Sequence, residues 1–587
     1  MECKWGIIRA IRVNDMKRLL RYLNNYKKEC VLAPLFKMLE ASFELIVPLV
    51  VASLIDVGIA NNDMKYIYLC IGGMIFLGFV GLLSSCTAQY FAAKAATGFS
   101  SELRQDLFAH LMSLSFKEID NIGTSTMITR MTSDVNQAQT GVNMFLRLFL
   151  RSPFVVFGAM IMAFTIDFKS ALIFVYVIIV LFAVVGFIMK KNIPMLKNVQ
   201  SLLDRILLLT RENLAGVRVL RAFCKEEAEI DEFVKSNDNL VLAQMKSGRV
   251  SGALNSLTYV IVNVAIVCLV YTGAVRVEAG FLTRGQVIAL YNYMSQILVE
   301  LIKLANLIIT LNKALASSER ISDVFDITNS QMIIESEEQY NDDFVVEFRN
   351  VSLKYHENSD EAVENVNLKV KKGQIVGIIG GTGSGKTSLI SLIPRFYDAT
   401  EGEVYVFGKN VKSYKPSELR GKIGVVLQKA ALFKGDIRSN LNYGNNNADL
   451  EELRNAAEIA VATDVVNAKG GFDGEVAQGG RNLSGGQRQR LTVARALAKR
   501  PEILILDDSA SALDFATEKK LNENIRNLEY KPTTFIVTQR ASSVINADLI
   551  VVLDDGKVVG AGTSDELLNS CSVYREIYNT QFQEVAK

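Results

Sequence analysis

The stretch IVGIIGGTGSGKTSLI, residues 375–390, decides the fold of the C-terminal half of this chain. An apolar strand, 375–379, leads into a glycine-rich loop that ends in Lys386 and Thr387 and opens a helix, which satisfies G-x-x-x-x-G-K-[ST] in the required strand–loop–helix setting. The glycines let backbone amides converge on phosphate oxygens, Lys386 supplies charge for the β and γ phosphates, and the Thr387 hydroxyl can ligate Mg²⁺. The residues expected to contact a nucleotide here are Gly380, Gly381, Thr382, Gly383, Ser384, Gly385, Lys386, Thr387 and Ser388.

Two further features in the same half fit nucleotide chemistry. The apolar segment 503–507 ends in Asp507, a carboxylate placed to hold Mg²⁺ through water. A glycine pair after a capping serine, in 483–487, opens a helix whose first amides attract an anion, although an ordinary capped helix is the alternative interpretation. Because the chain already has its own phosphate loop, this second feature indicates a nucleotide shared with another subunit. Its residues are Ser484, Gly485, Gly486 and Gln487.

Composition indicates a membrane portion. The chain has 587 residues, too many for one compact core, and half of them are hydrophobic while 21% are charged, with a mean hydropathy of +0.21. The net charge of +2 provides no overall basic field, so we expect no nucleic-acid partner. The seven cysteines are scattered without a C-x-x-C pair, which indicates free thiols and neither a disulfide framework nor a zinc site.

The N-terminal half contains six segments that predict membrane-spanning helices. Three are windows without any charged residue, and three are shorter or interrupted, and each can cross a bilayer with about 20 residues. Short links alternate with long charged links, and Lys/Arg concentrate in the N-terminal arm and beside the long links, so the positive-inside tendency places both termini and the long links in the cytosol. The windows lie between Lys65 and Lys94, Lys169 and Lys190, and Arg249 and Arg276; the weaker runs are 45–59, 152–166 and 286–311.

The predicted fold is therefore multi-domain, with a six-helix α-helical transmembrane domain followed by an α/β P-loop cassette. We expect the transmembrane domain, with two long cytosolic loops, in 1–312, a polar linker in 313–343, and the nucleotide-binding domain in 344–587. This makes the protein a multi-pass protein of the cytoplasmic membrane with a cytosolic cassette. The lipid bilayer is an expected partner.

The two long links favour helical extensions, each with a bend in the middle. Glycine and cap-type residues interrupt the helical pattern at 120–124 and 214–217, and arms of this length could reach a cytosolic domain; solvated loops without a coupling role are the alternative. Several polar residues on the spans either line a cavity or hydrogen-bond between helices. These are Asn255, Tyr259, Asn263, Asn292, Glu300, Lys303 and Asn306, whereas Lys37, Glu40 and Glu44 are expected on a wet cytosolic extension of the first span.

These residues together resemble a known family. The C-terminal half is similar to the nucleotide-binding domain of ATP-binding cassette (ABC) proteins, and the order of six spans then cassette resembles the half-transporter exporters of the multidrug and lipid group. The motifs that carry the resemblance are the phosphate loop, Leu483–Gln487, and the stretch from Arg395-Phe396-Tyr397-Asp398 through Leu419-Arg420 and 423–428 to Leu432-Phe433.

The resemblance implies roles for particular residues. Tyr355 matches the aromatic residue that stacks on adenine, Gln428 matches the glutamine between Mg²⁺ and the transmembrane contact, and 511–514 matches the loop through which two cassettes communicate. The family further implies ATP and Mg²⁺ as cofactors, and a head-to-tail sandwich in which each ATP lies between one chain's phosphate loop and the partner's Leu483–Gln487 equivalent. The implied metal ligands are Thr387, Gln428 and Asp507.

The sequence departs from the family at two catalytic positions. After Asp507 the family usually has a glutamate that polarises the attacking water, whereas this chain has Asp508, which is one methylene shorter. After the strand 534–538 the family has histidine, whereas this chain has Gln539, which cannot carry a proton or a positive charge. With Gln428, these are the candidate catalytic residues. The two changes predict a site that binds ATP but hydrolyses it slowly, and favour a heterodimer over a homodimer.

The function expected from the sequence is ATP-driven export of a hydrophobic or amphipathic compound, such as a drug or a lipid-like molecule, by one half of such a pair. A regulatory or channel-like ABC subunit that binds ATP without pumping is one alternative, and a peptide- or lipid-specific exporter is another. A soluble ABC ATPase of DNA repair or translation does not fit the six spans.

Overall fold

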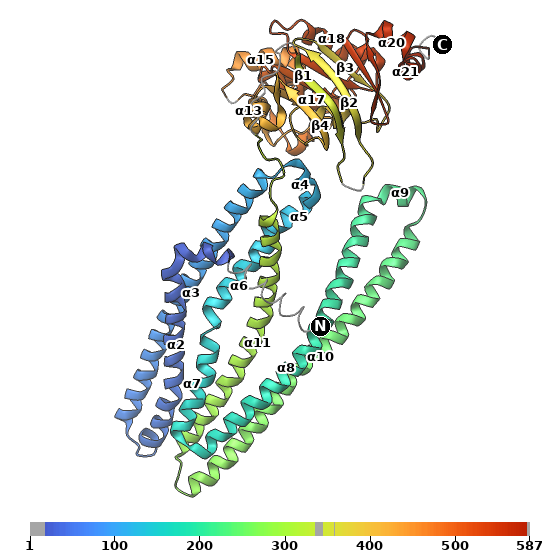
Figure 1. Ribbon diagram of the computed structural model, residues 1–587. Helices are drawn as coiled ribbons and strands as arrows, with labels where there is room; N and C mark the ends of the chain where they lie inside the picture. Colours follow the sequence, from blue (N-terminus) through green and yellow to red (C-terminus); the bar gives the residue numbers. More distant parts are fainter. Residues whose placement is uncertain (1–17, 335–343, 357–358, 446, 584–587) are drawn as a thin grey trace. The chain divides into compact units, whose positions relative to one another are not determined.

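The computed structural model describes residues 18–334, 344–356, 359–445 and 447–583, which form two compact units. The first unit holds the described part of Met1–Met112 together with Ser125–Ile327, and the second holds Ser113–Thr124 and the described part of Thr328–Lys587 (Figure 1). The second unit thus contains one short segment from the first long link.

The first unit is built from six helical segments, each long and apolar enough to cross a membrane. They confirm the six-helix prediction, and they continue well beyond a bilayer because the charged links are helical too. The segments run over Leu20–Ile59, Met64–Ser113, Thr124–Ile166, Phe168–Ala215, Glu226–Glu278 and Arg284–Asp326. Their helices are α2 (Lys27–Ser53), α3 (Met64–Ser113), α5 (Thr124–Thr129), α6 (Val135–Leu148), α7 (Arg151–Ile166), α8 (Phe168–Ala215), α9 (Val217–Ala222), α10 (Glu226–Glu278) and α11 (Arg284–Asp326).

Short links close one end of this unit with specific caps. The Asp167 carboxylate accepts from the Ser170 amide at 2.8 Å, which starts α8, and also from the Arg276 guanidinium at 2.5 Å, which ties α8 to the end of α10. Thr283 and Gln286 form a capping box at the start of α11. α11 then continues to Asp326, so helix extends into the segment that the sequence assigns to the polar linker.

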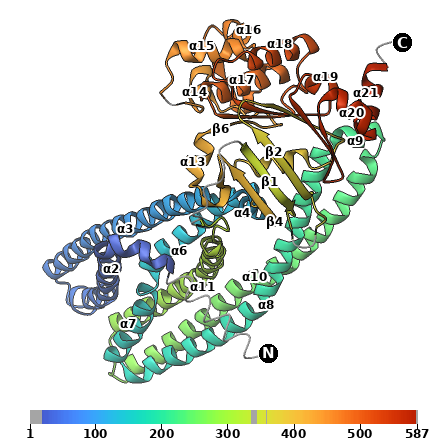
Figure 2. The ribbon, with the colours of Figure 1, turned by 45° about the horizontal axis from the view of Figure 1, so that its top comes forward.

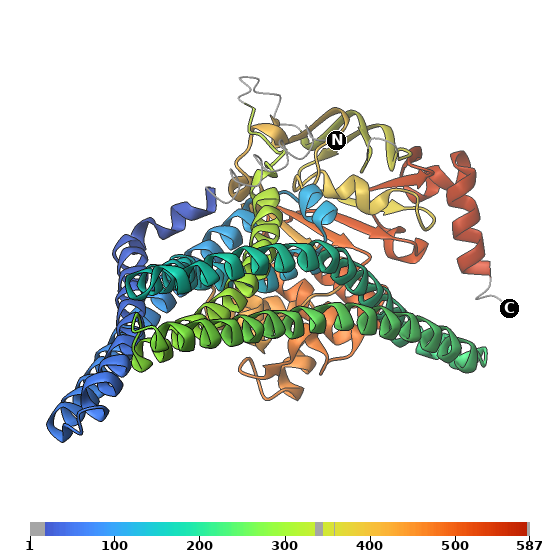
Figure 3. The same cartoon turned by 90° about the horizontal axis from the view of Figure 1, so that it is seen from below.

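At the other end the long links make the predicted helical arms with a bend. α3 has 50 residues, about 75 Å of helix, more than twice the span of a bilayer core. α9 turns the chain from α8 into α10, which lie side by side (Figures 1 and 3). The first long link turns at α4 (Phe116–Ile122), which ends at Gly123 with φ 77°.

The interior of this unit holds small residues, while its outside is apolar. On α3, Ala88, Ala92, Ala95 and Ala96 are fully buried, and small residues allow helices of a membrane bundle to approach closely. Large apolar side chains such as Phe76 are exposed on the outside, an arrangement suited to lipid.

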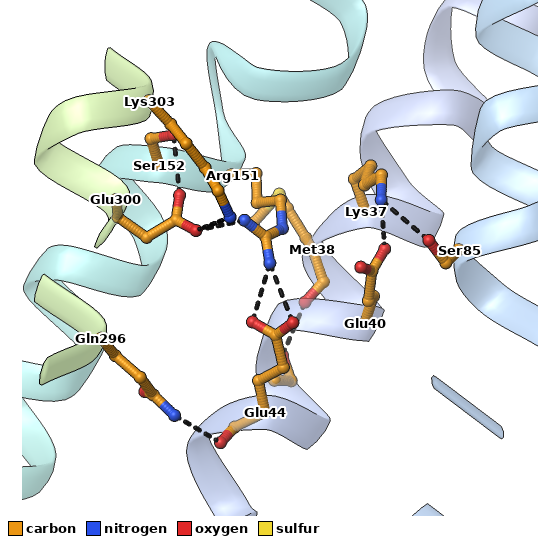
Figure 4. Close-up of polar contacts among 11 residues, drawn as sticks. Lys37, Met38, Glu40, Glu44, Ser85, Arg151, Ser152, Gln296, Glu300 and Lys303 are labelled. Carbon is orange, nitrogen blue, oxygen red and sulfur yellow. Dashed lines mark hydrogen bonds and ion pairs between the residues drawn. The ribbon is translucent and has the colours of Figure 1, made fainter. Parts of the chain in front are cut away.

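The structure shows the surroundings of several polar residues on these spans. The expectation that Lys37 and Glu40 lie on a wet extension is wrong: Lys37 is buried, and its ammonium donates to Glu40 at 2.5 Å and to Ser85 of α3 at 3.0 Å (Figure 4). These two hydrogen bonds, to a carboxylate one turn away and to a hydroxyl on the next helix, offset the free-energy cost of burying the ammonium group. The Asn263 amide donates to the carbonyl of Tyr259 in its own helix at 2.9 Å. Asn255 lies outside the residues whose side chains are described.

The second unit contains two larger sheets. One is antiparallel, in the order β2-β1-β4-β5, and its strands β2, β1 and β4 lie side by side in Figure 2. The other has the order β12-β11-β3-β10-β9-β6 and is parallel except for the edge strand β12. A third, two-stranded sheet pairs β7 with β8. The strands are β1 (Phe344–Leu353), β2 (Val363–Lys371), β3 (Ile375–Ile379), β4 (Glu401–Val406), β5 (Lys409–Asn410), β6 (Ile423–Val426), β7 (Gly435–Asp436), β8 (Glu475–Val476), β9 (Ile503–Asp507), β10 (Thr533–Thr538), β11 (Leu549–Asp554) and β12 (Lys557–Gly562).

Helices cover these sheets and complete the predicted α/β cassette. One face of the parallel sheet packs against α17, and its other face shares a core with the antiparallel sheet and α12. The helices of this unit are α4, α12 (Lys386–Ser391), α13 (Pro416–Gly421), α14 (Ile437–Asn442), α15 (Leu450–Ile459), α16 (Thr463–Ala468), α17 (Gly485–Ala498), α18 (Phe515–Arg526), α19 (Ala541–Val544), α20 (Ser564–Ser570) and α21 (Ser572–Gln583).

Arg395 is the largest fully buried side chain of this unit, and it joins three segments. Its guanidinium donates to both Asp398 oxygens at 2.7 and 3.1 Å, to the Lys412 carbonyl at 3.1 Å, and to the Met332 carbonyl at 2.8 Å. The Arg395→Met variant keeps the volume but leaves these acceptors unpaired, so we expect the cassette to lose about 3 kcal/mol of unfolding free energy. Urea denaturation of the full chain in detergent measures this; the exposed-surface control Lys372→Met should change it by less than about 0.5 kcal/mol. Equal stability of Arg395→Met and the wild type would contradict the assignment.

Candidate functional site

The geometry of the site follows from three adjacent parallel strands. β10 lies between β3 and β9, so the carboxyl ends of all three meet at one edge of the sheet. The phosphate loop follows β3, Asp507 ends β9, and Gln539 follows β10. The structure thereby brings together residues that lie up to about 160 positions apart in the sequence, around a cleft of about 240 Å³. The cleft is lined by Ala362, Thr382, Gly383, Ser384, Gly385, Lys386, Thr387, Ser388, Gln428, Asp507, Asp508, Val537, Thr538 and Gln539.

Two glycines of the loop are required by close backbone contacts. A Cβ on Gly380 would lie 2.1 Å from the Leu553 carbonyl oxygen, and one on Gly385 would lie 2.2 Å from the Ala362 carbonyl oxygen. Gly385 also has φ 89°, a left-handed conformation that glycine adopts without strain, and it starts α12. The loop is therefore curled tightly, with its amides at the start of a helix, which is the arrangement that attracts phosphate oxygens.

One group of polar and charged side chains in the cleft consists of Lys386, Thr387 and Asp507. The Lys386 ammonium donates to the carbonyls of Gly380 at 2.9 Å and Gly381 at 2.5 Å, and burial lowers its pKa. The Thr387 hydroxyl lies 3.0 and 3.1 Å from the two Asp507 oxygens. Burial also raises the pKa of Asp507, and the neighbouring Asp508 carboxylate adds to that shift. A hydroxyl and a carboxylate side by side are oxygen ligands of the kind Mg²⁺ prefers.

The candidate catalytic residues Gln428, Asp508 and Gln539 also line the cleft. The Gln428 amide approaches the Asp508 carboxylate at 3.4 Å, and the Thr382 hydroxyl approaches the Gln539 side-chain oxygen at 3.5 Å. Asp508 adopts φ 46°, a left-handed conformation in which aspartate is enriched, and its amide donates to Val537 of β10 at 2.9 Å. The backbone thus fixes Asp508 at the strand end, so its side-chain length sets how far the carboxylate reaches into the cleft.

Tyr355 reaches the loop from the antiparallel sheet. Its hydroxyl donates to Ser388 at 2.9 Å, and its ring stands edge-on to Tyr397, with centroids 5.0 Å apart and planes at 90°. It is not among the residues that line the cleft, although Ser388 is. An aromatic ring beside the loop is placed to contact a nucleobase next to the phosphates.

Tyr397 also contacts the short helix α4 within this unit. Its hydroxyl donates to Asp120 at 2.5 Å, and Phe116 packs on Phe396 with ring centroids 4.6 Å apart. Burial, reinforced by the Asp120 carboxylate, raises the pKa of Tyr397, so the hydroxyl stays protonated and keeps donating. The sequence contains the Phe396-Tyr397 pair within a family-like motif but indicates no role for it. Two aromatic residues in a polar loop indicate that the loop packs against another segment, but the sequence does not identify that segment.

The second glycine feature lies on another side of the same unit. Ser484 and Gln487 form a capping box at the start of α17, with bonds of 2.9 and 3.2 Å, as the sequence predicts for the cap. A Cβ on Gly486 would lie 2.9 Å from the Ala512 carbonyl oxygen, so the feature packs against the loop 511–514. The residues lining the cleft include none from 484–487 among those the structure describes, so the two phosphate-type features of this chain are separate.

Comparisons with known proteins agree with this geometry. The ABC transporter transmembrane region matches residues 30–301, and the ABC transporter cassette matches 363–511. An uncharacterized ABC transporter ATP-binding protein, YfiB of Bacillus subtilis, is 33% identical over 97% of this chain and 99% of its own length. A putative multidrug export ATP-binding/permease protein, YgaD of the same organism, is 31% identical over 96% of this chain and 99% of its own.

One further relative and one solved structure extend the comparison. The ATP-dependent lipid A-core flippase of Hahella chejuensis is 30% identical over 87% of this chain and 88% of its own. The structure of a bacterial Atm1-family ABC exporter with ATP bound has a TM-score of 0.80, covering 94% of this chain and 98% of that one, at 23% identity, which establishes the shared fold. With six spans, a cassette and full-length relatives, this chain belongs to the ABC transporter family, as a half-transporter of the exporter type that couples an ATP-binding cassette to a multi-pass membrane domain.

Proposed function

We propose that this chain is one half of a heterodimeric exporter that uses ATP to move a hydrophobic or amphipathic compound out across the cytoplasmic membrane, and that its own ATP site hydrolyses slowly. The observation that carries the proposal is the cleft itself, where a complete phosphate loop faces the two catalytic positions occupied by Asp508 and Gln539. Binding groups are intact, whereas groups that would activate water are shortened or replaced.

ATP binding is assigned to the loop and its neighbours. The amides of 380–388 and the Lys386 ammonium hold the phosphates, and Tyr355 stacks on the base. The Thr387 hydroxyl and the Asp507 carboxylate, already 3.0 Å apart, would hold Mg²⁺ together with Gln428. When bound, the ion neutralises charge on the β and γ phosphates.

Slow hydrolysis follows from side-chain reach. Asp508 is held at the strand end by its backbone, so the missing methylene withdraws the carboxylate by about 1 Å, enough to weaken the alignment of an attacking water. Gln539 can hydrogen-bond a phosphate oxygen, but it cannot supply a positive charge.

A second half-transporter completes the sites. The Ser484 cap and its glycine amides are intact yet stand apart from the cleft, so they are available to the ATP held by a partner. Two unlike sites, one slow and one fast, are the natural outcome when the partner has the glutamate and histidine that this chain lacks.

The names of relatives support the substrate class, and the charge pattern of the sequence supports the location. The relatives include a putative multidrug export protein and a lipid A-core flippase, and both names point to amphipathic cargo. The basic residues beside the long helical links place the cassette in the cytosol. A regulatory subunit that binds ATP without pumping is favoured by the same two catalytic departures; ATP-driven uptake into inverted vesicles by the purified pair separates it from an exporter.

Restoring the family residues should restore turnover. The double variant Asp508→Glu, Gln539→His of the full chain, purified alone, is expected to hydrolyse ATP at least about tenfold faster than the wild type, because a longer carboxylate reaches the water and an imidazole contacts the γ phosphate. Colorimetric phosphate release measures this. Adding Lys386→Ala should abolish the gain. A wild-type chain that already matches the double variant would refute the slow-site assignment.

The Tyr397 hydroxyl should hold α4 on the cassette. Tyr397→Phe removes only the bond to Asp120, and because hydrogen bonds to charged groups contribute about 1.5–3 kcal/mol, amide exchange in 113–124 should accelerate about tenfold or more. Mass spectrometry of deuterium uptake reports this, with nucleotide affinity unchanged. Tyr414→Phe, which loses a bond to the Val406 carbonyl instead, is the matched control. Unaltered exchange in 113–124 would show that the bond does not hold the helix.

Metal-dependent nucleotide binding should fall early on acidification. Because burial and Asp508 raise the pKa of Asp507, its carboxylate protonates at a higher pH than an ordinary aspartate, and Mg²⁺ binding is lost as the pH falls through that raised value. Asp508→Asn removes one cause and should move the loss to lower pH. Titration of Mg²⁺-dependent binding of a fluorescent ATP analogue tests this, with Asp473→Asn as an exposed control. No displacement for Asp508→Asn would contradict the coupling.

A further inference from the structure

Four ionisable side chains form a continuous chain of alternating charge inside the first unit. Glu44 of α2 accepts from Arg151 of α7, with both carboxylate oxygens 2.7 and 2.9 Å from the same guanidinium nitrogen. Arg151 also donates to Glu300 of α11, and Glu300 accepts from Lys303 at 2.8 Å (Figure 4). The order of charges is therefore minus, plus, minus, plus, from three helices.

Burial divides this charge chain, Glu44–Arg151–Glu300–Lys303, into a fixed middle and two open ends. The side chains of Arg151 and Glu300 are 6% and 4% exposed, whereas Glu44 is 43% and Lys303 is 41% exposed. Ser152 donates a further bond to Glu300 at 2.9 Å, so the middle pair keeps partners on both sides. The exposed ends, Glu44 and Lys303, have opposite charge. The Arg151 guanidinium and one Glu300 carboxylate oxygen lie between them.

The charge chain lies at membrane depth. Glu44, Arg151 and Glu300 are each 15 or 16 residues from the short-link end of their helical segments, at Ile59, Ile166 and Arg284, which corresponds to about 22–24 Å of helix. A bilayer core is about 30 Å thick, so the three side chains sit within it, nearer the end where the long links begin. Ionisable residues at that depth are costly and usually mark a pathway for substrate or ions.

One donor of the cluster is left over. The Arg151 Nε–H is buried and has no hydrogen-bond partner among the described residues. A buried donor without a partner is unfavourable, and an acceptor oxygen supplied from outside the chain would relieve it. This points to a ligand that brings oxygen acceptors to a site already holding opposite charges.

We infer that the charge chain is a binding site for the headgroup of a zwitterionic amphiphile, whose cationic group pairs with Glu44 and whose phosphate or carboxylate pairs with Lys303. The inference rests on the proposed function, of which it names the substrate class. The alkyl portion of such a ligand would lie along the apolar helices around the cluster.

Charge balance selects this class over simpler ions. The four side chains sum to zero, and a zwitterion keeps the sum at zero, with Arg151 and Glu300 still paired to each other. A lone cation on Glu44 or a lone anion on Lys303 would leave one net charge in a medium of low dielectric constant, where Coulomb terms are large. The two ends are half exposed, so each can pair with a ligand group while it keeps its partner within the charge chain.

Competition binding with matched amphiphiles tests the inference. The full chain in neutral maltoside micelles is titrated with probes of one alkyl length whose headgroups are phosphocholine, trimethylammonium, phosphate or an uncharged sugar, plus phosphocholine without a chain. The expected order places the phosphocholine amphiphile about fivefold tighter than either singly charged one, since it makes one half-exposed ion pair more and each such pair contributes up to about fivefold. Equal affinity for all four amphiphiles overturns the site, and chainless phosphocholine that binds equally well overturns the amphiphile class.

Single-end variants localise the two charges. Glu44→Gln should weaken the phosphocholine and trimethylammonium amphiphiles about fivefold and leave the phosphate one unchanged; Lys303→Gln should weaken phosphocholine and phosphate and leave trimethylammonium unchanged. Glu29→Gln and Lys313→Gln, on the same two helices but outside the charge chain, are the matched controls; Glu29 pairs with the half-exposed Lys94. Variants that weaken every probe equally, with normal gel-filtration profiles, would contradict the assignment.

ATP-driven uptake of each of the four amphiphiles into inverted vesicles, with the partner present, separates the two proposals. Uptake without headgroup discrimination in the binding assay overturns the substrate class alone. Headgroup discrimination with no ATP-driven uptake of any probe overturns the export function and leaves the binding site standing.

Discussion

The whole arrangement depends on the alignment of three parallel strands, β3, β10 and β9, whose carboxyl ends meet at one edge of a sheet. Each strand delivers one part of the site: the phosphate loop, Gln539, and the Asp507-Asp508 pair. The strands are buried on both faces and hydrogen-bonded in register, so the positions of these groups are set by the backbone. With the backbone fixed, the length and charge of the side chains at positions 508 and 539 decide what reaches the cleft, and we propose that this is why Asp508 and Gln539 slow hydrolysis.

The same unit also links the phosphate loop to α4 through a series of side-chain contacts. Tyr355 stands edge-on to Tyr397, and Tyr397 holds α4, the turn of the first long link, through Asp120 and the neighbouring Phe116 contacts. A base that stacks on Tyr355 therefore lies two side chains away from a segment covalently continuous with the membrane helices. In the first unit, Arg151 joins α2, α7 and α11, so a headgroup bound at its exposed neighbours acts on three spans together.

Sequence reasoning predicted the fold from patterns with local causes. The phosphate loop requires a strand before it and a helix after it, and six uncharged or weakly charged runs can only be membrane helices; both predictions are confirmed by the structure. Likewise, the capping pair Ser484 and Gln487 is a signal within one turn of helix. Residues around the cleft could be assembled because a known family supplies their order along the strands.

Contacts between distant segments were not predictable. The sequence predicts a solvent-exposed Lys37, because nothing near it in the sequence reveals Ser85 on the next helix. In the same way, the sequence around Glu44 gives no indication of Arg151, more than one hundred residues away. Tyr397 similarly required α4 to be placed beside it. A polar residue in an apolar run shows that a partner must exist, while only the packing shows which one.

The central claim is that this chain binds ATP and rarely cleaves it. Photo-cross-linking of an α-phosphate-labelled azido-ATP to the assembled transporter during turnover, followed by separation of the two subunits and chromatography of the attached nucleotide, measures this directly. The account predicts that this chain carries mainly triphosphate while its partner carries diphosphate. Diphosphate accumulating on this chain as fast as on the partner would contradict it.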